Sequence, residues 1–287
     1  MSLFHQFIAL VVTLVWGTNF VFIRFGLDEL APFTFAALRF FLVAFPLILI
    51  FPRPNAAWSH LVSYGLLIGF GQFGLLFWAM QADISPGLAS LIIQMQVFFT
   101  ILLAVVFAHE RLQLTQVFAL LVCLSGLLTI IVFTDAQTTP TGVVVTLVAA
   151  ASWAAGNLVV KRAGKIDILA FIAWSSIFAV PPLAAMAWYL ERPAGICRSL
   201  LDTSWRGWGV VLWQSIGNTL IGYGLWNMLL SRYTAATVAP WALLVPVFGM
   251  SASAVLLNEP MPWWKLLAMA LIFAGLVFNM LALHRIK

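Results

Sequence analysis

The sequence predicts an all-α integral membrane protein with ten transmembrane helices arranged as two inverted five-helix repeats. Three observations lead to this fold class. The 287 residues are 63% hydrophobic and only 8% charged, whereas a soluble protein carries about a quarter charged residues to hydrate its surface. The apolar residues fall into runs of the length that a helix needs to cross a hydrocarbon core of about 30 Å. Finally, residues of the first half of the chain recur in the second half.

The predicted spans are separated by short polar turns. They cover residues 4–24, 32–51, 61–81, 86–108, 112–133, 141–161, 168–190, 208–230, 235–257 and 263–283. The connecting segments leave no room for a soluble domain. The first run lacks a basic leader and an A-x-A-like cleavage site, so we expect it to be a retained helix.

The repeat is most evident between the first and sixth spans, where LVWGTNFVFIRFG (14–26) aligns with AASWAAGNLVVKRAG (150–164). The matched pairs include Trp16 with Trp153, Asn19 with Asn157, Arg24 with Arg162, Gly74 with Gly222, and Trp78 with Trp226. We therefore expect repeats at residues 1–135 and 140–287. A unit with five spans must insert its second copy upside down. Inverted repeats are typical of secondary transporters, whose substrate lies near the midplane between the repeats and which work by alternating access.

The distribution of Lys and Arg predicts the orientation of the chain. With the N-terminus inside, cytoplasmic segments contain Arg53, Arg111, Lys161, Arg162, Lys165, Arg232, Arg285 and Lys287, and opposite segments contain Arg24, Arg192, Arg198, Arg206 and Lys265. This excess predicts that both termini are cytoplasmic. The net charge of +5 is scattered over the span ends. It therefore indicates no nucleic-acid partner, and the lipid bilayer is the expected environment.

Polar and aromatic residues inside the spans predict the lining of a transport pathway, because polar groups in lipid usually face the bundle interior. The substrate-binding candidates are Trp16, Asn19, Gln72, Gln94, Trp153, Asn157, Trp174, Asn218, Tyr223 and Trp241. Residues three or four apart share a helix face, so each repeat presents a Trp and an Asn together. Gln94 is preferred over Gln96, because residues two apart are not expected to face one cavity. The alternative is that Asn19 and Asn157 only hold helices together.

Three charged residues within or at the ends of spans have two interpretations each. Arg39 in the second span either binds a carboxylate or has a structural role at the interface, and the structural role is favoured. Glu110 and Glu259 end the fourth and ninth spans. An ion pair or loop anchor is the favoured interpretation of these two, and a gate contact is the alternative.

The sequence contains none of the motifs that would indicate an enzyme or a pump driven directly by ATP. It has no G-x-x-x-x-G-K-[ST] loop, no cluster of histidines for a metal, and no nucleophile beside a base. We therefore predict no cofactor, no metal site and no enzymatic activity. No carboxylate lies in mid-span, which leaves proton antiport unsupported and facilitated diffusion open.

Several segments together resemble one family over nearly the whole chain. WGTNFVFIR, APFTFAALRFFLVAFP, PGLASLIIQMQVFFTILLA with HERL, SWAAGNL, GYGLWNMLLSRY and VAPWALLVPVFGMSASAVLLNE resemble the EamA family of the drug/metabolite transporter superfamily. The resemblance implies a central cavity and export of amino acids or related metabolites across the bacterial inner membrane. It transfers no substrate site. Efflux of hydrophobic drugs or dyes through the same cavity is the alternative, and a homodimer is left open.

Overall fold

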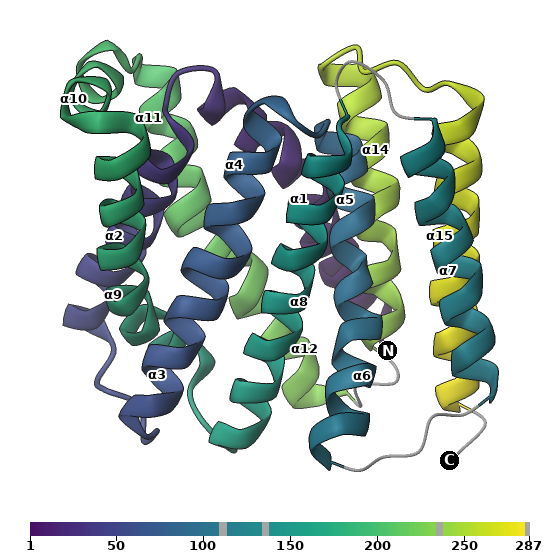
Figure 1. Ribbon diagram of the computed structural model, residues 1–287. Coiled ribbons are helices and arrows are strands. Elements are labelled where there is room, and N and C mark those ends of the chain that lie inside the picture. Colours follow the sequence, from purple (N-terminus) through teal and green to yellow (C-terminus); the bar gives the residue numbers. More distant parts are fainter. Residues whose placement is uncertain (109–113, 134–137, 234–237, 285–287) are drawn as a thin grey trace.

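The computed structural model describes residues 1–108, 114–133, 138–233 and 238–284, which form a bundle of helices without a β-strand (Figure 1). Within these residues, eight helical runs are long and apolar enough to cross a membrane. They cover Leu3–Leu27, Pro32–Ile50, Trp58–Ala82, Pro86–Phe107, Leu114–Val132, Pro140–Ala163, Ile168–Asp202 and Trp263–Leu281. The chain is therefore a multi-pass helical membrane protein.

The helical elements follow one another with short connections. The first half contains α1 (Leu3–Leu27), α2 (Pro32–Ile50), α3 (Trp58–Tyr64), η1 (Gly65–Gly74), α4 (Leu75–Ala82), α5 (Pro86–Ile92), η2 (Ile93–Met95), α6 (Gln96–Ala108) and α7 (Leu114–Val132). The second half contains α8 (Pro140–Ala163), α9 (Ile168–Met186), η3 (Ala187–Glu191), α10 (Arg192–Asp202), α11 (Trp205–Leu212), η4 (Trp213–Tyr223), α12 (Gly224–Arg232), η5 (Ala239–Leu243), α14 (Leu244–Leu256) and α15 (Trp263–His284).

The two other expected spans, 208–230 and 235–257, are helical but do not meet the length and hydropathy of a membrane span. α11, η4 and α12 run without a break from Trp205 to Arg232, and the second segment contributes a shorter apolar helix, Trp241–Leu256. The first of them is less apolar because η4 contains Gln214, Asn218 and Thr219, all buried inside the protein. Protein neighbours, rather than lipid, surround these polar groups.

Several helices begin at a residue that the sequence makes suitable as an N-cap. Asp167 accepts hydrogen bonds from the backbone N–H groups of Leu169 (2.9 Å) and Ala170 (3.1 Å) at the start of α9. Thr139 accepts one from Gly142 before α8, whose first residue is a proline. Such side chains satisfy N–H groups that have no partner inside the helix.

Both halves contain the same two departures from α-helical geometry. η1 and η4 are π-helical, and η2 and η5 are 3₁₀-helical. In each half a π segment precedes the 3₁₀ segment, and the second half contains one further π segment, η3, near its second helix. Such irregular turns are frequent at functional sites. Here they widen or tighten the helices that surround the centre of the bundle.

The two halves pack against each other through several pairs of helices. α2 packs against α9 and α7 against α15, while α1 packs against α14 and α6 against α8. α1 and α8 run in opposite directions, because the end of α1 and the start of α8 both meet the end of α4. Arg24 donates to the carbonyls of Met80 and Gln81 there, and the Thr139 N–H donates to the carbonyl of Asp83.

The end of the bundle at which α10 and α11 lie, at the top of Figure 1, contains three carboxylates that link the two halves. Each accepts hydrogen bonds at a helix start of the other half, and we call this region the sealed end. The bonded pairs are Glu191 with the Phe33 N–H (2.6 Å) and the Thr34 N–H (3.1 Å) and hydroxyl, Glu29 with the Ser204 N–H (2.6 Å) and hydroxyl, and Glu259 with the Ser85 hydroxyl and the Gly87 N–H (3.0 Å).

Glu259 also forms an ion pair, which confirms the favoured interpretation of this residue. Its Oε1 atom lies 3.2 Å from Nζ of Lys265, and both side chains are buried. The corresponding Glu110 lies outside the described residues. The expected ion pair therefore joins two helix ends within the second half. The same Glu259 carboxylate accepts hydrogen bonds at the start of α5 in the first half.

Candidate functional site

A cavity of about 520 Å³ lies among the helices of both halves. Eight predicted substrate-binding residues line it, namely Trp16, Asn19, Gln72, Gln94, Trp153, Asn157, Asn218 and Tyr223. They come from α1, η1, η2, α8 and η4. None of the described residues that line the cavity is charged. Its size is in the range of about 300–1,000 Å³ that is typical of small-molecule sites.

The two Trp-and-Asn pairs face the same cavity, as their helical spacing predicts. Trp16 packs against Tyr223 and Trp226, with ring centroids 5.5 and 5.1 Å apart. Asn157 donates a hydrogen bond from Nδ2 to Oε1 of Gln96 at 3.1 Å. The space between the pairs is thus bounded by aromatic rings and by carboxamides.

Some of these carboxamides have hydrogen-bonding capacity that the protein does not use. The side-chain oxygens of Asn19, Gln72, Asn218 and Asn279 are buried and have no hydrogen-bond partner in the protein. An unpaired buried polar atom costs about 1–3 kcal/mol. All four residues line the cavity.

Gln94 and Gln96 both line the cavity, so the expectation that only one of them faces it is wrong. The physical reason is the local helix type. Gln94 lies in the 3₁₀ segment η2, where three residues complete a turn. Positions two apart are then about 120° from each other on the helix rather than about 160°. Gln94 donates to the carbonyl of Ala242 (3.3 Å) across the two halves.

Two predicted residues lie outside the cavity. Trp174 donates from its indole N–H to the carbonyl of Phe51 at 3.1 Å and packs against Trp58 near the end of α2. Trp241 packs in a small cluster with Ala9, Leu229 and Val238. Tryptophan is amphipathic and often anchors a helix end with one polar contact, and sequence alone does not separate this role from a place in the pathway.

The sequence analysis missed several lining residues, including Tyr64, Trp226, Asn227 and Asn279. Asn279 is the clearest omission, because it is a single carboxamide in the apolar tenth span. The reasoning that identified Asn19 would also have identified it. Asn227 and Trp226 lie near a span end, where polar and aromatic residues are ordinary and carry no specific signal.

The cavity extends toward the end of the bundle opposite the sealed end. Its lining includes Ile168 at the start of α9, Leu230 near the end of α12, and Met280 near the end of α15. The start of α1 and the end of α15 also lie toward this end, as the N and C marks in Figure 1 show. The two ends of the bundle therefore differ, because carboxylates link the two halves at one end and the cavity extends toward the other.

Comparison with known proteins places these features in a family. The family model described as the EamA-like transporter family matches residues 3–132 and 140–281. A "Probable amino-acid metabolite efflux pump" of Salmonella typhimurium is 38% identical to this chain, covering 97% of it and 95% of the relative. The Escherichia coli protein of the same description is 36% identical, covering 96% and 95%.

More distant relatives are similar over nearly the same length. A "Probable terminal-alkyne amino-acid exporter" of Streptantibioticus cattleyicolor is 26% identical, with 94% of this chain and 91% of the relative covered. One protein of known crystal structure superimposes with a TM-score of 0.67 at 20% identity, covering 99% of this chain and 98% of the other. That similarity supports the fold.

Proposed function

Because this chain belongs to the EamA-like transporter family, we propose that it is a secondary transporter that exports neutral amino acids and related metabolites by alternating access. The observation that carries the proposal is the uncharged cavity of about 520 Å³, lined by tryptophan, tyrosine and carboxamide side chains. Aromatic rings suit the apolar part of an amino acid. The unpaired amide oxygens of Asn19, Gln72, Asn218 and Asn279 suit its ammonium group.

The relatives support the same class of substrate. Their printed descriptions name amino-acid metabolites for the proteins of Salmonella typhimurium and Escherichia coli, and a terminal-alkyne amino acid for that of Streptantibioticus cattleyicolor. All three describe export, which sets the expected direction of transport for this chain.

Alternating access is supported by the relation between the two halves. α1 and α8, which contain the matched Trp-and-Asn pairs, run in opposite directions and line one cavity. The π and 3₁₀ segments occur in the same order in both halves. These features fit ten spans in two inverted repeats, residues 1–135 and 140–287. Rocking of the repeats would break the carboxylate contacts at the sealed end and close the opposite end.

We assign the protein to the bacterial inner membrane with both termini in the cytoplasm, so the sealed end faces outward. The exposed Cys197 on α10 tests this orientation, because α10 lies at the sealed end (Figure 1). A membrane-impermeant maleimide should label it in intact spheroplasts. Cys123 is buried, so Cys197→Ser should abolish the labelling. Labelling only after the membrane is permeabilised would reverse the orientation.

The decisive experiment for the proposed function uses purified protein in liposomes with a panel of labelled neutral amino acids, with and without a pH gradient. Transport of at least one of them, abolished by leaving the protein out, is the expected result. A change in rate with the gradient would indicate proton coupling. Transport of none of them by the wild-type protein overturns the proposal.

Efflux of hydrophobic drugs or dyes is the second candidate, and the ring cluster of Trp16, Tyr223 and Trp226 favours it. Such rings bind lipophilic cations through their faces. The two functions separate in a resistance test. Cells expressing the protein should survive an excess of toxic amino-acid analogues under the first proposal. Protection against lipophilic dyes alone would support the second.

A further inference from the structure

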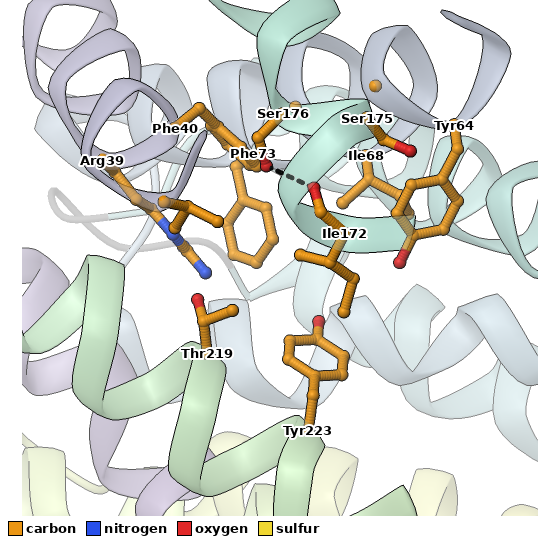
Figure 2. A pocket seen from close by; sticks show the side chains of 13 residues that line it. Arg39, Phe40, Tyr64, Ile68, Phe73, Ile172, Ser175, Ser176, Thr219 and Tyr223 are labelled. Atoms are coloured by element: carbon orange, nitrogen blue, oxygen red, sulfur yellow. Dashed lines mark hydrogen bonds between the residues drawn. The ribbon is translucent and has the colours of Figure 1, made fainter. Parts of the chain in front are cut away.

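A small chamber opens beside the cavity and contains the guanidinium group of Arg39. It has a volume of about 20 Å³, room for about one water molecule. Tyr64, Phe73 and Tyr223 line both the chamber and the cavity, so they form the partition between the two spaces. Figure 2 shows the Arg39 side chain directed into the chamber, toward the hydroxyl of Thr219.

Arg39 is 2% exposed, and its charge has no carboxylate partner among the described residues. Its Nε and Nη1 atoms are buried and have no hydrogen-bond partner. The guanidinium carbon lies 3.7 Å from the centre of the Phe73 ring and 5.5 Å from that of Phe40. A cation over a ring gains about 0.5–2 kcal/mol, whereas burial of an unpaired ion costs several kcal/mol. The rings therefore leave much of the cost uncompensated.

No hydroxyl group around the chamber accepts a hydrogen bond from Nε or Nη1 of Arg39. Ser175 and Ser176 instead donate to the carbonyls of Phe171 (2.6 Å) and Ile172 (2.8 Å) in their own helix. Neither α2 nor α9 contains a carboxylate side chain, and none lines the chamber. Asp167, the N-cap of α9, lies outside the chamber. The planar guanidinium fork is thus held ready for a planar anion, and a carboxylate matches it best.

We propose that Arg39 binds the carboxylate of a substrate whose remaining part lies in the cavity. The inference rests on the proposed function, because it takes the substrate to be an amino acid. The chamber is too small for a whole amino acid but adjoins the cavity at Tyr223 and Phe73. A small shift of these rings admits the carboxylate. The ammonium group then faces the amide oxygens of the cavity, and recognition requires both charges of the zwitterion.

The test compares amino acids with their carboxamides, which keep the side chain and amine but lack the anionic group. L-cysteine, L-leucine, L-phenylalanine and the three carboxamides are titrated against purified protein, and binding is measured by thermal stabilisation in detergent. The wild type should bind at least one of these amino acids about 10- to 100-fold more tightly than its carboxamide, which is the value of hydrogen bonds to a charged group.

Arg39→Met should bring the ratio of the two affinities close to one. It should also unfold at the same or a higher temperature than the wild type without ligand, because an apolar residue replaces an unpaired buried charge. Arg39→Lys keeps the charge but loses the planar fork, so the ratio should fall to an intermediate value. Arg198→Gln removes an exposed arginine on α10 and should leave the ratio unchanged.

The outcomes separate the inference from the proposed function. A folded Arg39→Met protein that keeps the wild-type ratio overturns the role of Arg39 and leaves the proposed function intact. If Arg39→Met does not fold, an unchanged ratio in Arg39→Lys overturns it equally. Failure of the wild type to transport any amino acid in liposomes overturns the proposed function, and with it the inference.

Discussion

Buried polar groups are paired at the sealed end and unpaired in the centre of the bundle. At the sealed end, Glu259 accepts hydrogen bonds from Ser85 and Gly87 and pairs with the buried Lys265. In the middle of the bundle, Arg39 is equally buried but has no anionic partner among the described residues, and the Asn19 oxygen has no hydrogen-bond partner in the protein. Paired groups hold the helices in place, whereas unpaired groups leave binding capacity for a ligand.

This contrast predicts that substitutions at the sealed end reduce stability and that substitutions at unpaired groups of the cavity reduce transport. The largest effect is expected for Glu259→Ala, which removes a buried carboxylate that pairs with Lys265 and accepts hydrogen bonds from Ser85 and Gly87. We expect the free energy of unfolding to fall by about 3–5 kcal/mol. Denaturant unfolding in mixed micelles measures it. Asp202→Ala removes an exposed carboxylate on α10 and is the control. A loss of under about 1 kcal/mol would show that the pair adds little.

Gly222→Ala tests whether the shape of the cavity depends on close packing of Trp16. A methyl group at Gly222 would overlap the Trp16 indole, so the ring must turn away. We expect a loss of about 1–3 kcal/mol in stability and lower transport in liposomes. Gly224→Ala is the matched control, because its nearest neighbour is 4.0 Å away. Equal transport by the two variants would exclude a role for the Trp16 position.

Asn19→Leu separates binding from stability at an unpaired carboxamide. The side-chain oxygen of Asn19 has no partner in the protein, so the free energy of unfolding should change by less than about 1 kcal/mol. The apparent KM for the exported amino acid should rise about tenfold, the effect of one lost hydrogen bond to a charged group. Asn157→Leu also breaks the bond to Gln96 and should lose stability as well. An unchanged KM in both variants would support the alternative that Asn19 and Asn157 only hold helices together.

Trp174→Phe is expected to have the smallest effect. In contrast to Asn19→Leu, it should lower stability and leave transport unchanged. Trp174 lies outside the cavity and donates to the carbonyl of Phe51. Loss of this hydrogen bond should cost about 1 kcal/mol of stability and leave the transport KM unchanged. Thermal unfolding in detergent and liposome assays on the same preparation measure both. A raised KM would place Trp174 in the pathway after all.

The sequence predicted correctly which residues share a helix face, because that depends on one helix alone. Trp16 with Asn19, and Trp153 with Asn157, share helix faces by their spacing, and all four line the cavity. It failed where the local backbone departs from an α-helix. The 3₁₀ segment that brings Gln94 and Gln96 to one cavity is formed by IQM. This tripeptide contains no proline or glycine that would indicate a departure from α-helical geometry. It also failed for Trp174, whose hydrogen-bond partner Phe51 follows the end of a different helix, α2.

The sequence by itself determined that the chain is a multi-pass membrane protein and which helix faces are polar, because bilayer thickness and helical period act within each segment. Only the tertiary structure decided whether the buried polar groups without a partner nearby in the sequence are satisfied. Lys265 and Arg39 are both cations within apolar surroundings in the sequence. Their difference is that the Glu259 carboxylate reaches Lys265, whereas Arg39 lies over the Phe73 ring and has no carboxylate partner among the described residues. Glu259 is six residues from Lys265, so the sequence indicated that pair, whereas the surroundings of Arg39 are formed by α2, η1, α9 and η4, which are far apart in the chain.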